Sequence, residues 1–150
     1  MSVVYDLVSH GYTAWSYSLI GLAIAIALFA LRPIYDRRSQ RLLTLMIGVA
    51  LFVSAAMLII TWDNYHWLRQ QIMKGKVRTV DGIVTDFIPE GPGGHPGESF
   101  RVDTVTYSYG SYELMPGFRQ TMPKGGPIRA GLHVRIQDVD GTIVHLEIAR

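Results

Sequence analysis

The stretch from Leu42 to Trp62, LLTLMIGVALFVSAAMLIITW, decides how this 150-residue chain is organised, because its 21 residues carry no charge. At 1.5 Å per residue, a helix over this stretch is about 32 Å long, close to the roughly 30 Å hydrocarbon core of a bilayer. The stretch therefore predicts a membrane-spanning helix.

A second uncharged stretch precedes it, from Ala14 to Leu31, with 18 residues and a helical length of about 27 Å. Of the 39 residues in the two stretches, 32 are apolar, and the rest are Gly, Ser and Thr, whose hydroxyls can bond back to their own helix. A pair of buried core helices is the alternative, but the length and continuity of the runs favour a transmembrane hairpin with spans at about 14–31 and 42–62. Asp6 and the absence of Lys and Arg before the first span argue against a cleaved signal peptide.

The connector between the spans, residues 32–41, is basic and supplies the topology determinants Arg32, Arg37, Arg38 and Arg41. Since Lys and Arg accumulate on the cytoplasmic side, we expect a cytoplasmic connector in a bacterial inner membrane, with both termini and the C-terminal domain outside. The basic residues that follow the second span keep the reverse orientation open. The same arginines could attract anionic lipid headgroups, although a role in topology is the simpler interpretation.

Residues at the two outer ends of the hairpin are rich in aromatic rings, which predicts one aromatic belt at a shared membrane face. These residues are Tyr12, Trp15, Tyr17, Trp62, Tyr65 and Trp67. Small residues also recur four apart, at Gly21 with Ala25 and at Ala50 with Ser54, which favours close packing within the hairpin over a dimer interface.

The composition changes after residue 74, where 12 of the 15 Gly and six of the seven Pro lie. Turn residues alternate there with β-branched and aromatic runs, which indicates short strands. We divide the chain into an N-terminal tail with the hairpin (1–64), an interfacial linker (65–76) and a small all-β domain (77–150). Its strands are expected at 77–88, 99–109, 132–137 and 142–148, in a closed or nearly closed OB-like or SH3-like barrel. The stretch 112–131 is expected to be mostly loop, anchored in the core by Phe118.

The last two strands allow a prediction of register. Val134 opposite Leu146, with Ile136 opposite Val144, would place all apolar side chains on one face. That register predicts a three-residue loop, 139–141, and argues against a two-residue Asp140–Gly141 turn. The polar face would then hold four candidate residues, with His133 across from Glu147 and Arg135 across from His145.

Composition and motifs exclude several functions. The chain has no cysteine, so disulfides and thiolate sites are excluded, and its net charge of +2 gives no support to nucleic-acid binding. No cofactor motif is present. His133, His145 and Glu147 are the best metal-binding or acid–base candidates, but a zinc site needs a further ligand, and a solvated strand face is the expected role. His95 lies in a Gly/Pro loop, where a surface position is expected.

The C-terminal half, about residues 77–148, resembles a domain of uncharacterised small bacterial membrane proteins, a group that implies no particular activity. The resemblance is carried by DGIVTDF (81–87), ESFRV (98–102), YSY (107–109), PGF (116–118), GGPI (125–128) and GLHVRI (131–136). A second similarity, to NfeD-like proteins, is carried by the Gly-x-x-Val-x-Ile strand at 131–136, the Asp-Gly turn and the final apolar strand. That resemblance implies a membrane-anchored OB-type barrel that partners a stomatin-like protein, although the 112–131 excursion departs from its pattern.

These observations predict a non-enzymatic integral membrane protein whose small β-barrel binds a membrane protein partner or a second copy, as an accessory or scaffold subunit. The first interface candidates are aromatic residues and methionines, which are enriched in interfaces, with the barrel core as their alternative place. They are Tyr107, Tyr109, Tyr112, Met115, Phe118 and Met122. A ligand- or lipid-sensing barrel and an enzyme using His133, His145 and Glu147 remain the alternative functions.

Overall fold

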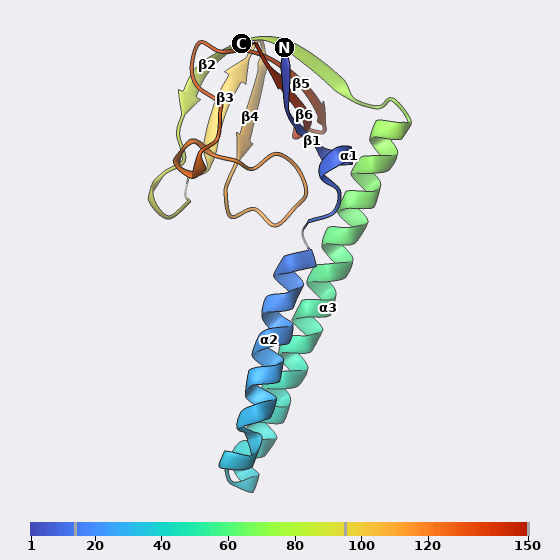
Figure 1. The fold of residues 1–150 in the computed structure, drawn as a ribbon, viewed down its shortest axis with the longest axis vertical. Helices are drawn as coiled ribbons and strands as arrows, with labels where there is room; N and C mark the ends of the chain where they lie inside the picture. Colours follow the sequence, from blue (N-terminus) through green and yellow to red (C-terminus); the bar gives the residue numbers. More distant parts are fainter. Residues whose placement is uncertain (14, 95, 150) are drawn as a thin grey trace. The chain divides into compact units, whose positions relative to one another are not determined.

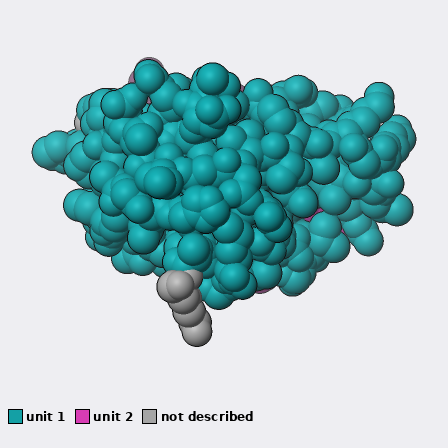
Figure 2. Space-filling model, turned by 90° about the horizontal axis from the view of Figure 1, so that it is seen from above, with its two compact units in different colours: residues 1–11, 66–150 teal, residues 12–65 magenta. Residues whose placement is uncertain are grey.

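The computed structural model describes residues 1–13, 15–94 and 96–149. Ala14, at the expected start of the first span, and His95, the loop histidine, lie outside the described residues, as does the side chain of Tyr17. The chain forms two compact units: unit 1 contains residues 1–11 and 66–150, and unit 2 contains residues 12–65. Figure 2 shows unit 1 in teal as one continuous packed body.

Unit 2 is a pair of packed helices, α2 (Trp15–Leu31) and most of α3 (Arg37–Met73), joined by the short 3₁₀ turn η1 (Arg32–Ile34) (Figure 1). Ser54 of α3 donates a 2.8 Å hydrogen bond to the carbonyl oxygen of Ser18 on α2. A Cβ on Gly21 would lie 2.2 Å from the Ser54 Oγ, so the helices approach closely because position 21 has no side chain. Small residues thus serve packing within the pair.

Among the described residues, α3 is the one helix long and apolar enough to cross a membrane by length and composition. It continues past the uncharged stretch through most of the expected 65–76 linker, so that linker is largely helical. The helix ends at Met73. Two residues further on, Gly75 has a φ of +67°, which suits a residue without a side chain, and the amide of Lys76 donates to the carbonyl of Gln71 at 2.9 Å.

Unit 1 is built on a six-stranded antiparallel sheet with the order β1-β6-β5-β2-β3-β4. The strands are β1 (Ser2–Asp6), β2 (Arg78–Ile88), β3 (Glu98–Val102), β4 (Val105–Tyr109), β5 (His133–Val139) and β6 (Thr142–Ile148). Three short helical segments complete the unit: α1 (Leu7–His10), η2 (Pro92–Gly94) and η3 (Met122–Lys124).

The β domain was expected to be a closed or nearly closed OB-like or SH3-like barrel, and the sheet of the described residues is not closed. Within the described part of the chain the sheet is open, and β1 and β4 form its two edges. Strand β2 pairs with β5 over Arg78–Ile83 and with β3 from Val84 onward, so the sheet bends along this strand without closing. The all-β character of the domain is confirmed.

The expectation of an N-terminal tail is also corrected. Residues 2–6 form strand β1, which pairs with β6 so that Ser2 lies opposite Ile148 and Asp6 opposite His145. The strands at the two ends of the chain therefore pair in one sheet (Figure 1). The helical pair is inserted between them in the sequence.

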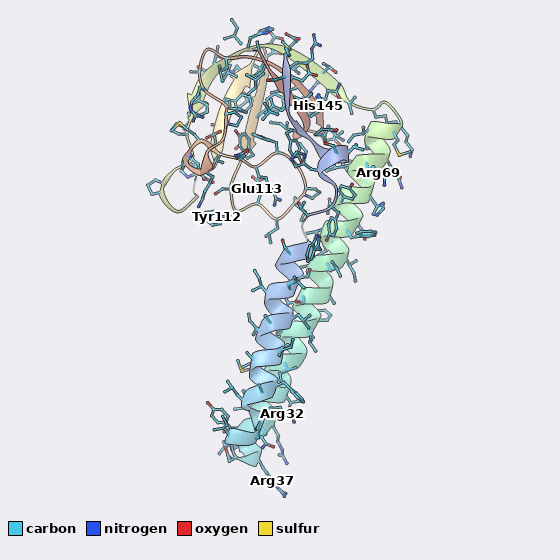
Figure 3. All side chains as sticks on the ribbon, in the orientation of Figure 1. Arg32, Arg37, Arg69, Tyr112, Glu113 and His145 are labelled. Atoms are coloured by element: carbon cyan, nitrogen blue, oxygen red, sulfur yellow. The ribbon has the colours of Figure 1, made fainter. Side chains whose placement is uncertain are left out.

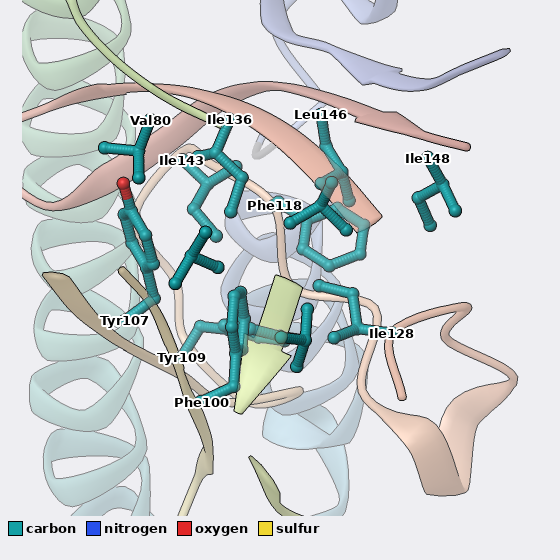
Figure 4. Close-up of a cluster of buried hydrophobic side chains, with 13 residues drawn as sticks. Val80, Phe100, Tyr107, Tyr109, Phe118, Ile128, Ile136, Ile143, Leu146 and Ile148 are labelled. Atoms are coloured by element: carbon teal, nitrogen blue, oxygen red, sulfur yellow. The ribbon is translucent and has the colours of Figure 1, made fainter. Parts of the chain in front are cut away.

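The core lies on one face of the sheet and is dominated by β-branched and aromatic side chains (Figure 4). Its members are Val80, Val84, Phe100, Val102, Tyr107, Tyr109, Phe118, Ile128, Val134, Ile136, Ile143, Leu146 and Ile148. Phe118, which comes from the 112–131 excursion, is 4% exposed and stacks edge-on against Tyr109, so its expected role as the anchor of that loop is confirmed.

The predicted register of the β5–β6 hairpin is wrong, by one residue next to the turn and by two residues beyond the bulge. Ile136 pairs with Leu146 and Val134 with Ile148, around the two-residue turn Asp140–Gly141. Both turn residues have positive φ, +50° and +85°, as a tight hairpin turn requires. The apolar faces still match because a bulge opposite Gln137–Asp138 accommodates Val144 as an extra residue.

Candidate functional site

The four polar-face residues expected from the sequence do come together, on the outer side of the sheet. Two of them share one carboxylate of β2: Asp81 Oδ1 lies 2.9 Å from His133 Nε2, and Asp81 Oδ2 lies 2.8 Å from Arg135 Nε. The guanidinium of Arg135 reaches Glu147 Oε2 at 4.0 Å on the neighbouring strand.

The same chain of charges continues to the edge strand. Glu147 Oε1 lies 3.3 Å from His145 Nε2, and His145 Nδ1 lies 3.8 Å from Asp6 Oδ1 on β1. We call this set of six side chains the polar ladder: Asp6, Asp81, His133, Arg135, His145 and Glu147. It crosses four adjacent strands, β2, β5, β6 and β1.

The partners inside the polar ladder differ from those predicted. Arg135 lies across from Glu147, and Gln137 lies across from His145, because the two-residue turn and the bulge at Val144 together shift the pairing by two residues. Sequence reasoning missed Asp6, since residues 1–11 were expected to be a tail, and it gave Asp81 no part in this face. The alternation of β2 was the signal that could have placed Asp81 beside His133.

The polar ladder has the properties of a structural surface network. Its side chains are between 22% and 51% exposed, where individual ion pairs contribute little to stability. A group of three or more His, Asp or Glu side chains placed to share a metal ion is absent from the described residues.

A second set of polar side chains is buried and fixes the long excursion to the sheet. In the structure this excursion begins directly after β4 ends at Tyr109, so it comprises residues 110–131. Glu98, at the start of β3, is 0% exposed and accepts hydrogen bonds from the Tyr109 hydroxyl and, at 2.6 Å, from the amide of Met122. Burial and this carboxylate raise the pKa of the Tyr109 phenol, so the hydroxyl stays protonated as a donor.

Glu90, which follows β2, fixes the same excursion at two further points. Its carboxylate accepts a 2.7 Å bond from the amide of Ser111 and a 2.8 Å bond from the hydroxyl of Thr121. The backbone bond from Ser111 holds the pKa of Glu90 below its ordinary value. The excursion is thus positioned by two carboxylates although it has little regular structure.

A third carboxylate, Asp138 on β5, is 1% exposed and fully engaged. It accepts hydrogen bonds from Arg78 Nε at 2.9 Å, Arg78 Nη2 at 3.0 Å, the Tyr107 hydroxyl at 2.8 Å and the Gly141 amide at 3.0 Å. Burial and the bond to Asp138 raise the pKa of Tyr107. Because each carboxylate oxygen of Asp138 already accepts two hydrogen bonds, we assign this side chain a structural role.

The six interface candidates divide into two groups. Tyr107, Tyr109 and Phe118 are 1% to 4% exposed, so the interface expectation fails for them because they fill the core of the sheet. Tyr112, Met115 and Met122 are 61%, 46% and 36% exposed, and we call these three residues the excursion surface.

Two basic residues, Lys124 and Arg119, contact residues at or next to the excursion surface. The Lys124 ammonium lies 5.5 Å from the centroid of the Tyr112 ring, a distance suited to a cation–π contact. The guanidinium of Arg119 donates to the carbonyl of Glu113. Glu113 follows Tyr112 on the excursion (Figure 3). A cavity of about 80 Å³ beside Met115 and Phe118 is much smaller than ordinary small-molecule sites.

Comparison of the chain with protein-family models, with curated proteins and with solved structures finds no match.

Proposed function

We propose that the chain is a non-enzymatic integral membrane protein, in which α2 and α3 cross the bilayer as a hairpin and the sheet unit binds a protein partner. In this role it is an accessory or scaffold subunit of a membrane complex. The observation that carries the proposal is the exposure of large apolar side chains along both helices of one compact unit.

On α2 the exposed apolar residues include Ile20, Ile26 and Phe29, at 59%, 61% and 62%. On α3 they include Leu45 and Phe52, at 66% and 75%. Soluble monomers rarely leave contiguous apolar surfaces of this extent in water. A hydrocarbon environment removes the unfavourable hydration of these side chains, and the helices satisfy their own backbone groups, as a lipid environment requires.

The path of the chain out of the sheet unit and back into it favours an even number of membrane crossings. Strand β1 and strands β2–β6 belong to one unit, so the chain leaves that unit after Gly11 and returns to it at His66. If α3 crosses the bilayer, the chain needs a second crossing to return, and α2 is the helix available for it. Although α2, with 17 residues, is slightly short, tilting of α3 and local thinning of the bilayer accommodate such differences at modest cost.

Aromatic residues at one end of the hairpin support a membrane boundary there. The Tyr12 ring contacts the rings of Trp62 and Tyr65, with centroids 5.2 and 5.6 Å apart. The Tyr12 hydroxyl shares a 2.6 Å hydrogen bond with Thr61, which is 1% exposed. Such amphipathic rings prefer the headgroup level of a bilayer.

We place the partner at the excursion surface, because exposed Tyr and Met side chains on a fixed loop have the composition of an interface core. The connector arginines favour a cytoplasmic connector, which puts the sheet unit on the outer face of a bacterial inner membrane. A second copy of the chain and a stomatin-type membrane protein, as the resemblance to NfeD-like proteins implies, are partners of the kind proposed.

Two measurements test this function. Alkaline carbonate extraction should leave the protein in the membrane pellet, and a C-terminal alkaline phosphatase fusion, active only outside the cytoplasm, should be active. Recovery of the protein in the soluble fraction would contradict the membrane assignment.

The partner is tested by site-specific cross-linking, which is straightforward because the chain has no native cysteine. A Tyr112→Cys variant carrying a thiol-linked photo-cross-linker should give one discrete cross-linked product in membranes. Thr106→Cys, at an exposed position of β4, is the matched control and should give none. Equal labelling of many proteins from both positions would argue against a specific partner at the excursion surface.

A further inference from the structure

The connector of the helical pair, residues 32–41, carries four arginines and a single acid, Asp36. Arg37, Arg38 and Arg41 are exposed, and the described residues hold no ion pair to any of the three. Arg32 and Arg37 lie at the connector end of the two helices (Figure 3). This end is therefore a strongly positive surface without an internal counter-charge apart from Asp36.

The turn that displays the arginines is fixed by side-chain bonds to backbone. The side-chain amide nitrogen Nε2 of Gln40 donates to the backbone carbonyls of Arg32 and Tyr35 at 3.1 and 3.0 Å. The carboxylate of Asp36 accepts hydrogen bonds from the amides of Arg38 and Ser39, at 3.1 and 3.4 Å. These bonds fix the backbone that carries the arginines, and Asp36 is occupied as the cap of α3.

The placement of these charges is unfavourable in the isolated chain. Arg37 and Arg38 stand in the first turn of α3, which contains no acidic residue, where the helix dipole repels cations. Arg37 and Arg41 are four residues apart on the helix, so their like charges also repel each other. An external anion would relieve both repulsions.

The surroundings of the arginines indicate which anion. Ile34 is 75% exposed and Tyr35 is 48% exposed, and both stand beside the basic residues at the ends of two apolar helices. A phospholipid offers a phosphate for the guanidinium groups and a hydrocarbon region for the apolar side chains. A soluble phosphate offers only the first.

We propose that the connector is a binding site for anionic phospholipids, with Arg37, Arg38 and Arg41 on the headgroup phosphate and Ile34 in the adjacent hydrocarbon. This inference rests on the proposed membrane hairpin. It adds a ligand class to a segment that otherwise serves as a topology determinant.

The test is native mass spectrometry of the purified full chain in detergent, with phosphatidylglycerol or phosphatidylcholine added at equal concentration. Because the measurement is made in micelles, a change of topology in the cell does not affect it. The wild-type chain should retain phosphatidylglycerol about tenfold more strongly than phosphatidylcholine, since each basic residue near a membrane surface contributes to headgroup attraction.

Three variants sharpen the test. R37Q/R38Q/R41Q should lose the preference, whereas R69Q/K74Q/K76Q, which removes the same charge from the other end of α3, should keep it. Gln40→Ala keeps all arginines but releases the turn, so it should reduce the preference by a smaller factor. The preference should survive millimolar inorganic phosphate.

Retention of the preference in R37Q/R38Q/R41Q, or its absence in the wild type, would overturn the proposal. Displacement of the lipid by inorganic phosphate at comparable concentration would assign the site to soluble phosphate instead, and would overturn the lipid assignment as well. Failure of the membrane hairpin itself would appear separately, as loss of the protein from the pellet after carbonate extraction.

Discussion

The hydroxyl of Tyr107 on β4 donates a 2.8 Å hydrogen bond to the carboxylate of Asp138 on β5. The two strands are not neighbours, since β2 and β3 lie between them in the sheet. The bond therefore spans the concave core face of the sheet and ties its outer part, β3 and β4, to the central strands. Arg78 and the Gly141 amide occupy the remaining acceptor positions of Asp138.

Removing this cross-sheet bond should destabilise the sheet unit measurably. Tyr107→Phe deletes one hydrogen bond and should lower the free energy of unfolding by about 1 kcal/mol. Asp138→Ala should cost more, about 3 kcal/mol, because it leaves a buried phenol and a turn amide without an acceptor. Urea unfolding of the full chain in detergent, followed by near-UV circular dichroism, measures both values. Tyr112→Phe, at an exposed position, is the control, and an equal effect in it and in Tyr107→Phe would contradict the role of the bond.

The Asp140–Gly141 turn makes a second prediction, which concerns backbone conformation alone. A Cβ at position 141 meets nothing within 4 Å, so a side chain there causes no clash. The φ of +85° nevertheless disfavours any residue with a Cβ, and Gly141→Ala should therefore cost about 1 kcal/mol of stability. Asp140→Gly, at a φ of +50°, should be neutral or stabilising by the same reasoning. Urea midpoints of the two variants should move in opposite directions or differ clearly, and equal midpoints would contradict the two-residue turn.

The register of this hairpin shows where sequence reasoning reached its limit. The alternation of β5 and β6 predicted the two strands and their apolar face, and both are present. Strict alternation of apolar residues along both strands then required a three-residue loop, because regular pairing without a bulge was assumed. The bulge at Val144 lets the favourable Asp-Gly turn form without exposing either apolar face, so local turn chemistry prevailed over regular pairing.

Long-range pairing explains the other differences. Residues 2–6 form a strand only because β6 lies beside them, with a sequence separation of more than 130 residues, and a five-residue segment shows no period of its own. Similarly, Glu90 and Glu98 are acids near a Gly/Pro loop, and their burial becomes apparent only when the excursion folds over them. The uncharged helical stretches were predictable, because their length and composition are local properties of the sequence.

Acidification should loosen the excursion through Glu90. The bond from Ser111 lowers the pKa of Glu90 in the folded state, so its ionised form contributes stability above the ordinary value of 4.5, and this contribution is lost as the pH falls through the lowered value. Glu90→Gln should therefore be less stable than the wild type at neutral pH, and the difference should shrink on acidification below 4.5. Urea midpoints at pH 7 and at low pH test this. Glu113→Gln, an exposed acid on the same excursion, should show no such convergence, and parallel pH profiles of wild type and Glu90→Gln would contradict the role of Glu90.

The helical pair offers a prediction with an internal control, because its two central glycines differ in surroundings. A Cβ on Gly21 would lie 2.2 Å from Ser54 Oγ and 3.3 Å from the carbonyl of Ala50, whereas a Cβ on Gly48 meets nothing within 4 Å. Gly21→Ala should therefore push α2 from α3 and cost about 1–3 kcal/mol, the usual range for overpacking. Gly48→Ala should be neutral or stabilising, since alanine favours the helix.

The second half of this test assigns the clash to one side chain. Ser54→Ala removes the oxygen nearest to the new methyl group, so the double variant Gly21→Ala/Ser54→Ala should be more stable than the sum of the two single effects predicts. Unfolding in mixed micelles of increasing denaturing detergent gives the required free energies. It is followed by the fluorescence of the three tryptophans, Trp15, Trp62 and Trp67, all of which lie on α2 or α3. Simple additivity of the two substitutions, or an equal loss in Gly48→Ala, would show that Gly21 does not set the distance between the helices. A positive coupling would instead place the closest helix contact at Gly21 and Ser54, where the bond from Ser54 to the Ser18 carbonyl already links the two helices.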